Sequence, residues 1–147
     1  MEPPPDVTDS YTGKCRCGAV SLVYTTSIAP SGWSVRACQC FFCRAHGACA
    51  TSDPSGTVRF EVANSGSLVR YQFGLRTAQF LICRRCGVYV AAVITTPRGR
   101  FATINVNVLD PSPEGLPAAQ VITYEQETRA QRIARRGQKW TPVIGTV

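Results

Sequence analysis

The sequence predicts a mainly β domain built around cysteine metal sites. Its 147 residues, 44% of them hydrophobic, suit one globular domain with a single core. Short apolar segments recur between turn-rich connections, and many of them show the two-residue alternation of strands. Eight cysteines in a chain of this length are too many for ordinary packing, and we interpret them as metal ligands.

The first half of the chain predicts three strands. The earliest is AVSLVY at 19–24, a short run of strand-forming residues. TVRFEV at 57–62 alternates strictly, so its three apolar side chains share one face. SLVRYQF at 67–73 follows across ANSG, a connection of turn-forming residues.

Three more strands are predicted after residue 78. QFLIC at 79–83 and VYVAAVI at 88–94 flank the last pair of cysteines. TPRG at 96–99 predicts a turn, and FATINVNV at 101–108 alternates after it. In that strand the apolar face is Ile104, Val106 and Val108, opposite Thr103, Asn105 and Asn107.

The two ends of the chain have a different character. Prolines and acids in residues 1–12 predict a flexible N-terminal arm. YEQETRAQRIARR at 124–136 is the one good helical candidate, and we predict a basic C-terminal segment over 125–147. Arg129, Arg132 and Arg136 fall on one face of that helix, and a solvated face is the simplest interpretation of such a charge run.

Charge and targeting signals give broad expectations. The formal net charge is +7, and it falls to +4 if seven cysteine thiolates bind two Zn²⁺ ions. A basic balance is compatible with an acidic small molecule, nucleic acid or an anionic surface. The start of the chain has no secretory pattern and no apolar run spans a bilayer, so we expect a cytoplasmic protein without a membrane partner. In that reducing setting stable disulfides are not expected.

Two short motifs indicate a closed metal site. CRCG places Cys15 and Cys17 before a glycine, and CRRCG does the same for Cys83 and Cys86. Glycine permits the tight, positive-φ turn that aims backbone N–H groups at sulfur. Together the four cysteines would make a tetrathiolate, which contributes folding energy and leaves no position open for chemistry.

The central motif CQCFFC indicates a different site. Cys38, Cys40 and Cys43 would hold zinc on three sides and leave the fourth position open, as catalytic zinc sites do. Three thiolates make an electron-rich metal, better suited to a substrate thiolate than to ionising water. His46 is a candidate fourth ligand or proton shuttle, or a loop histidine without such a role. Cys49 is either a small core residue or a fourth ligand that closes the site.

The spacing of the cysteines leaves other arrangements open. Disulfides in an oxidising compartment, one zinc with spare thiols, and a different pairing of the groups all remain compatible with it. GKCRCGAV, CQCFFCRAHGA and CRRCGVYV, in this order and at these separations, resemble the glutathione-dependent formaldehyde-activating enzyme family. This resemblance covers most of the chain and places the zinc domain over 13–124. It implies the Mss4-like β fold that the family shares with centromere protein V.

The resemblance also implies that the cysteines form two zinc sites with different roles. It assigns a structural zinc to Cys15, Cys17, Cys83 and Cys86, and a labile, catalytic zinc to Cys38, Cys40 and Cys43. It implies a carbon–sulfur lyase-type reaction, the addition of glutathione to formaldehyde. Three arginines near the cysteines, Arg44, Arg84 and Arg85, are then candidates to bind glutathione carboxylates, or are ordinary surface charges.

Two alternatives remain beside this reading. The same scaffold could catalyse another small-molecule step, such as a decarboxylation, an isomerisation or a cyclisation. A non-catalytic zinc module would instead use the basic tail to bind nucleic acid or an acidic partner. Aromatic residues do not interleave with the basic ones as a base-stacking surface requires, which argues against nucleic acid. The sequence does not determine the oligomeric state.

Overall fold

The structure is a computed structural model that describes residues 8–147. Strands dominate it, which confirms the predicted fold class. The strands are β1 Asp9–Lys14, β2 Val20–Thr26, β3 Arg36–Cys38, β4 Ala50–Thr51, β5 Thr57–Val62, β6 Leu68–Tyr71, β7 Gln79–Cys83, β8 Tyr89–Thr96, β9 Gly99–Asn105, β10 Gln120–Ile122 and β11 Thr141–Pro142. The α-helices are α1 Phe41–His46 and α2 Arg129–Lys139, and short 3-10 turns lie at Pro30–Gly32, Ser65–Ser67 and Val106–Val108.

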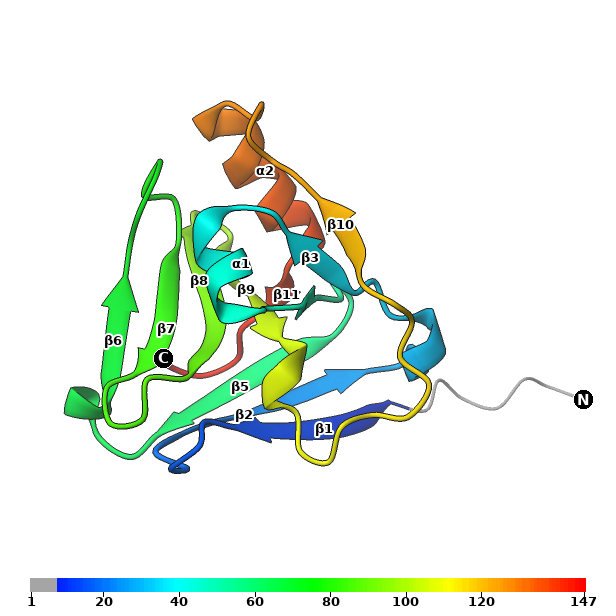
Figure 1. The fold of residues 1–147 in the computed structure, drawn as a ribbon, viewed down its shortest axis with the longest axis vertical. Helices are drawn as coiled ribbons and strands as arrows, with labels where there is room; N and C mark the ends of the chain where they lie inside the picture. The colour runs from blue at the N-terminus through cyan, green and yellow to red at the C-terminus, as the bar shows by residue number, and fades with distance from the viewer. Residues whose placement is uncertain (1–7) are drawn as a thin grey trace, which may run out of the picture.

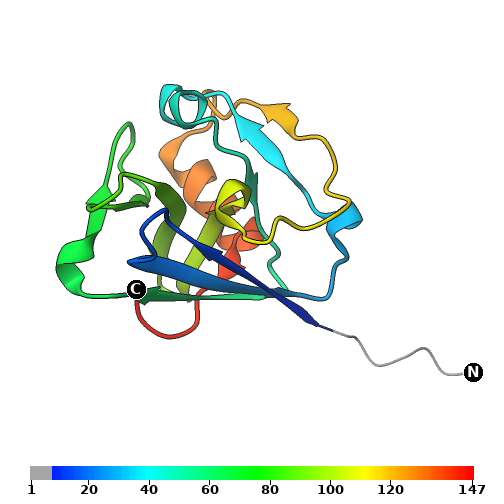
Figure 2. The ribbon, with the colours of Figure 1, turned by 60° about the horizontal axis from the view of Figure 1, so that its bottom comes forward.

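The strands form two sheets. The smaller is antiparallel with the order β1-β2-β5, and it lies along the lower side of Figure 1. The larger has the order β10-β3-β4-β9-β8-β7-β6, with β11 paired to β9. Only β10 and β3 run parallel among the pairs of the larger sheet in the described residues. Figure 2 shows the smaller sheet crossing in front of the strands of the larger one.

The central strand β8 is buried on both faces. Val90 and Val93 belong to the main core between the two sheets, together with side chains such as Leu22. Tyr89 and Ala92 belong to a second apolar cluster. A strand covered on both sides must be apolar throughout, which explains the unbroken run VYVAAVI. Much of the second cluster lines the cavity described below.

Several predicted elements match the structure closely. The strands predicted at 57–62 and 79–83 are β5 and β7 with the same bounds, and the turn at 96–99 joins β8 to β9. The strand predicted over 101–108 is wrong at its end, because β9 stops at Asn105 and a 3-10 turn follows. The Asn105 side chain accepts a hydrogen bond from the Asn107 N–H at 3.2 Å, which competes with continued strand pairing.

The N-terminal prediction needs correction. Residues 1–7 of the predicted arm lie outside the described residues, but residues 9–12 form part of β1 rather than a loose segment. Tyr11 anchors this strand through an edge-on contact with Trp33, with ring centroids 4.9 Å apart. That contact is long-range, so the local composition carried no sign of it.

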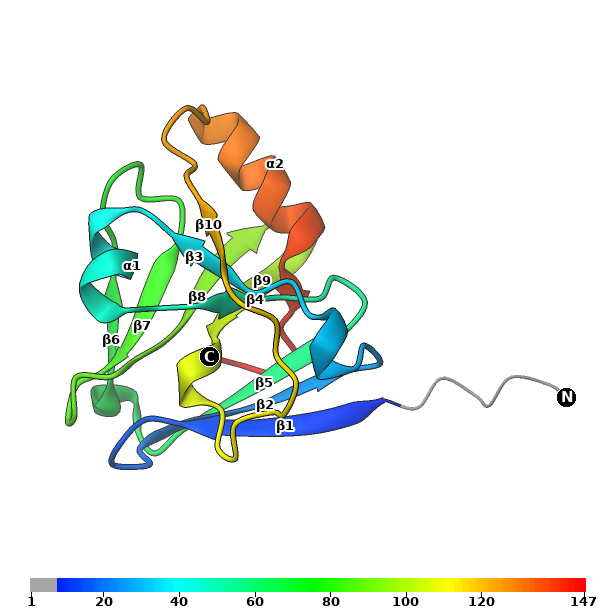
Figure 3. The same ribbon diagram turned by 45° about the vertical axis from the view of Figure 1, so that its right-hand side comes forward.

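The prediction for the C-terminal helix was wrong in the position of the helix and in the exposure of its arginines. Residues 124–128 precede it, because Thr128 caps the helix and forms a capping box with Gln131. Helix α2 packs against β8 and β9, and Figure 3 shows it beside the larger sheet. Its arginine face is therefore half-buried at Arg132 and Arg136, where the charge run predicted a solvated surface. Neither helix of the described part is long and apolar enough to cross a membrane.

Candidate metal centres and the adjoining cavity

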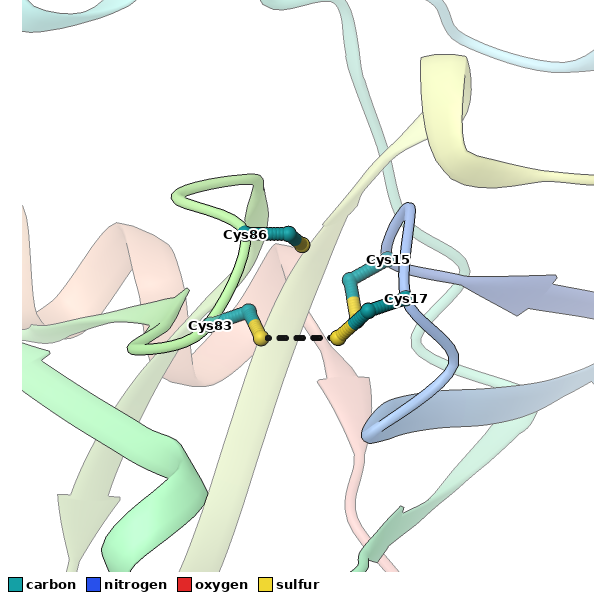
Figure 4. Close-up of side chains that lie close together, drawn as sticks. All are labelled: Cys15, Cys17, Cys83 and Cys86. Carbon is teal, nitrogen blue, oxygen red and sulfur yellow. Dashed lines mark hydrogen bonds between the residues drawn. The ribbon is translucent and has the colours of Figure 1, made fainter.

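The first cysteine group joins the ends of two strands from different sheets. Cys15 and Cys17 follow β1, while Cys83 ends β7 and Cys86 lies in the turn after it. Figure 4 shows the four side chains converging from these two turns. Every sulfur lies within 4.8 Å of the other three. The group therefore connects the small sheet to the large one.

The two turns have the same backbone design. The N–H of Gly18 donates to the carbonyl of Cys15 at 3.2 Å, and that of Gly87 donates to the carbonyl of Cys83 at 2.8 Å. Both glycines adopt a positive φ, of 81° and 79°. A side chain at either position would strain this backbone, which explains the glycine after the last cysteine of each motif. The predicted glycine turns are confirmed.

The geometry of the four sulfurs fits a tetrahedral zinc ion. Zn–S bonds of about 2.3 Å in a tetrahedron put neighbouring sulfurs about 3.8 Å apart. The Cys15 and Cys17 sulfurs are 3.7 Å apart, and those of Cys17 and Cys83 are 3.6 Å apart. Cys15 and Cys83 are almost fully buried. Burial raises the pKa of Cys86, but hydrogen bonds from the backbone of Val88 and Cys17 outweigh it and lower that pKa to about 6.

The second group contains three cysteines on one short stretch. Cys38 ends β3, Cys40 caps α1, and Cys43 lies within α1. Their sulfurs lie within 4.8 Å of one another, and all three side chains are half-buried. Hydrogen bonds from Cys38 and Cys43 hold the pKa of the Cys40 thiol well below its usual range. We call these residues the cysteine trio, and soft thiolates in this number also fit zinc.

The cysteine trio forms part of the wall of a cavity of about 270 Å³. Aromatic rings from the second apolar cluster line it, including Phe80, Tyr89 and Trp140. Burial, and then the negative charges of Cys43 and Cys40, raise the pKa of Tyr89 well above its usual value. The Tyr89 hydroxyl therefore keeps its proton and is a hydrogen-bond donor beside the trio.

Four arginines also line this cavity, and they come from β3 and α2: Arg36, Arg132, Arg135 and Arg136. Arg135 pairs with both carboxylate oxygens of Glu127 and lies 3.7 Å over the ring of Tyr124. Burial, followed by the neighbouring Arg135 and Arg132, lowers the pKa of Arg136 to about 10. The trio thus shares its cavity with a concentrated positive charge.

The predicted site residues fall in different places. The His46 ring is exposed and lies against Phe42, with centroids 4.4 Å apart. It is not within 4.8 Å of all three trio sulfurs. Cys49 is half-buried, touches the main core and lines the cavity outside the trio. All eight cysteines are free thiols.

The predicted arginines are not part of the cavity wall. Arg84 and Arg85 are exposed in the turn that carries Cys86. Arg44 is exposed on α1, where it donates to the carbonyl of Gln39 at 3.0 Å. None of the three lines the cavity. The sequence placed them close to cysteines along the chain, but they do not border the open space.

The arginines that do line the cavity were missed as binding residues. Arg132, Arg135 and Arg136 follow an i, i+3, i+4 pattern that puts them on one side of a helix. The sequence contained this signal, but it did not show which side of α2 meets the protein. Arg36 stands two residues before Cys38, so it shares a face of β3 with the first trio cysteine.

Comparisons with known proteins agree with the cysteine pattern. A family model described as glutathione-dependent formaldehyde-activating enzyme matches residues 10–126. A crystal structure of a Rhodobacter sphaeroides protein, solved as a structural-genomics target, is similar with a TM-score of 0.54 and 30% sequence identity. That match covers 77% of this chain and 99% of the other. A comparison with curated proteins found no significant match. The chain belongs to the glutathione-dependent formaldehyde-activating enzyme family.

Proposed function

We propose that the protein is a zinc enzyme of carbon–sulfur lyase type, which makes or breaks the bond between a thiol and a small carbonyl compound. Glutathione and formaldehyde are the reference pair that the family description supplies. The observation that carries the proposal is the position of the cysteine trio, which has three ligands and borders a cavity. A purely structural metal would not need such a space.

The two cysteine groups take different roles in this proposal. The tetrathiolate of Cys15, Cys17, Cys83 and Cys86 would hold a structural Zn²⁺ that ties the two sheets together. Cys38, Cys40 and Cys43 would hold a second Zn²⁺. When bound, that ion supplies a Lewis acid with one position open to a substrate thiolate.

The reaction needs little more than positioning and one proton. In the forward direction the thiol sulfur bonds to the carbonyl carbon, the carbon–oxygen π bond breaks, and the oxygen gains the proton that the thiol has lost. The reverse direction breaks the carbon–sulfur bond. The Tyr89 hydroxyl, which keeps its proton beside the trio, would hydrogen-bond the carbonyl oxygen as it becomes negative. The apolar walls at Phe80 and Trp140 would exclude water and hold the two reactants together.

The arrangement of α2 weakens the alternative of a nucleic-acid-binding module. Such a module needs its arginines on the surface, to neutralise phosphates. Here Arg132 and Arg136 are half-buried against the domain and line the cavity. A different small-molecule reaction on the same scaffold is favoured by one observation, the cluster of arginines, which points to an acidic substrate.

The experiment is a direct assay of adduct formation. Glutathione and formaldehyde combine spontaneously, so the assay must show that the enzyme accelerates their exchange with S-hydroxymethylglutathione. NMR line broadening or saturation transfer measures the rate of that exchange. Zinc-loaded protein should raise the exchange rate in proportion to its concentration, and Cys40→Ser should abolish that increase. Cys49→Ser is the matched control, since Cys49 lines the cavity outside the trio. No acceleration with any thiol and aldehyde pair by protein that holds two zinc ions would refute the proposal.

A further inference from the structure

We propose that Arg36, Arg132 and Arg136 form an oxyanion subsite inside the cavity, which selects a small substrate with one anionic group on an apolar body. We call these three residues the arginine subsite. The inference deepens the proposed function and rests on it only in treating the cavity as a substrate pocket. The shared chemistry is that of a carboxylate or a phosphate, which both match a planar guanidinium.

The positive charge at the cavity is not balanced by the protein. One carboxylate, Glu127, accepts two hydrogen bonds from Arg135, at 2.7 and 3.0 Å. The same carboxylate lies 3.4 Å from the Nε atom of Arg132. Two guanidinium groups therefore share one negative charge, and Arg132 makes the longer, weaker contact with it.

The other two arginines of the subsite meet only neutral oxygens. Arg136 donates to the hydroxyl of Thr77 at 2.6 Å. Arg36 donates to the hydroxyls of Ser52 and Thr103 at 2.9 and 3.1 Å. Such bonds fix the direction of each guanidinium without neutralising it. Desolvation lowers the pKa of Arg136, so this cation is held in a place that favours an anion.

Two buried Nε atoms make no hydrogen bond within residues 8–147, although that of Arg132 keeps its weak ion pair with Glu127. The Nε atoms of Arg132 and Arg136 are screened from solvent and make no hydrogen bond to any described residue. A buried donor without a partner costs about 1–3 kcal/mol, and native proteins keep few of them. Two on adjacent turns of one helix, both from residues that line one cavity, indicate a ligand that accepts their hydrogen bonds.

The negative charge of a zinc-loaded cysteine trio is too small to neutralise the arginines that line the cavity. Three thiolates on Zn²⁺ carry one net negative charge. Glu125, which borders the cavity, and Glu127, which pairs with Arg135, add two more. Against these stand the four guanidinium groups that line it, so a positive charge remains. A thiol substrate with one oxyanion would supply the missing charge.

The rest of the cavity sets the shape of the ligand. The Arg136 guanidinium lies 4.8 Å over the ring of Trp140, which holds its plane against an apolar wall. Phe73, Phe80 and Tyr89 complete that wall. A volume of about 270 Å³ suits a small metabolite. The cavity therefore matches a compact molecule with an apolar middle and a single anionic end.

Two of the three arginines of the subsite lie outside the family match. The family model ends at residue 126, and α2 begins at Arg129. The trio and Arg36 lie inside the matched region, while Arg132 and Arg136 lie beyond its end. On this account α2 changes which substrate reaches the trio, and leaves the chemistry at the trio as it is.

The test uses a ligand that lacks a thiol, so that it does not depend on the proposed reaction. The zinc-loaded full chain is titrated calorimetrically with 3-phenylpropionate and with 3-phenylpropionamide, which share one body and end in a carboxylate and a neutral amide of similar shape. The acid should bind at least about tenfold more tightly than the amide, the strength of a charge-assisted hydrogen bond. Arg136→Gln should bring the ratio of the two affinities close to one, and Arg132→Gln should reduce it.

Arg129→Gln is the matched control. Arg129 lies on the same helix, is exposed, and does not line the cavity, so its loss should leave the ratio unchanged. Inorganic phosphate, titrated in the same way, separates the two kinds of oxyanion. Phosphate binding that depends on Arg136, without binding of 3-phenylpropionate, would assign the subsite to phosphate esters.

Two results would overturn the inference. Equal affinities for acid and amide in the unmodified protein, with no binding of phosphate, would mean that the arginines recognise no anion. An acid preference that Arg129→Gln and Arg136→Gln reduce equally would make it a general effect of charge. If Arg136→Gln does not fold, the affinities of the unmodified protein for the acid and the amide decide alone. If the protein turns over thiol adducts but shows no preference for the acid, only the subsite is refuted. If it prefers the acid but turns over no thiol adduct, only the proposed function is refuted.

Discussion

The Cys40 sulfur accepts a hydrogen bond from the backbone N–H of Cys43 at 3.4 Å, so one side chain both caps α1 and belongs to the cysteine trio. This bond holds the Cys40 sulfur against the first turn of α1, which also carries Cys43. Gly47 ends the helix in a left-handed conformation, which limits α1 to one and a half turns of chain. A short, capped helix thus presents the trio at the edge of the cavity.

This double role makes Cys40→Ser a specific probe of the trio. Serine is a good N-cap, so α1 should persist and the melting temperature should stay within a few degrees. One of two zinc ions should be lost, together with turnover, because a trio without its middle thiolate holds metal poorly. Thermal unfolding and metal analysis on one preparation provide the check. Unfolding as severe as that of a tetrathiolate variant would contradict the separation of the two sites.

The tetrathiolate should behave in the opposite way. Cys86→Ser should give insoluble or unfolded protein, because the metal site joins β1 to β7 and its binding energy is part of the folding energy. Cys49→Ser, which changes a cysteine outside both groups, should remain folded with two zinc ions. Soluble yield, circular dichroism and zinc content measure the difference. A folded Cys86→Ser protein with full zinc would disprove the structural assignment.

The ion pair that positions α2 should show a defined pH dependence. Hydrogen bonds from Arg135 lower the pKa of Glu127 below its usual 4.5. A lowered carboxyl pKa gives stability that is present above the unfolded-state pKa and is lost as the pH falls through the folded-state pKa. Glu127→Gln should therefore cost about 1 kcal/mol, by the same amount at pH 6 and pH 8. Denaturant unfolding of both proteins tests this, and a difference that grows between those values would contradict it.

Substitutions of Tyr89 and of His46 should lower turnover by different amounts. Tyr89→Phe removes the protonated hydroxyl beside the trio and should lower turnover at least about tenfold, with zinc retained. His46→Ala should also retain zinc and lower turnover less, since the exposed His46 ring packs on Phe42. Rates and metal content of the two variants provide the measurement. Loss of the second zinc in His46→Ala would instead make His46 a ligand.

Local patterns explain what could be predicted from the sequence. Strict alternation defined β5, and the glycine after each outer cysteine pair indicated the turns that bring four sulfurs together. Both signals are short-range, because they depend on the period of a strand or on the φ angle of one residue. The trio is equally local, since its members span only Cys38 to Cys43.

Long-range packing explains what could not be predicted. Tyr11 belongs to a strand because β1 pairs with β2, and its ring packs on Trp33; nothing in the proline-rich start predicts either contact. The arginines of α2 have the same spacing whether they face water or a cavity, and only the packing of α2 on β8 and β9 decides between the two. Arg84 and Arg85 show the converse, because the cysteines beside them belong to the closed four-cysteine group and do not line the cavity.

The most direct measurement of the central claim is zinc K-edge X-ray absorption on the purified chain, with and without glutathione. The two cysteine groups contain four and three sulfurs, so two zinc ions should show an average of 3.5 sulfur ligands each, with one lighter ligand on one of them. Saturating glutathione should raise the average to about 4, as a substrate thiolate takes the open position at the trio. One zinc per chain, or four sulfurs per zinc before any thiol is added, would contradict the account.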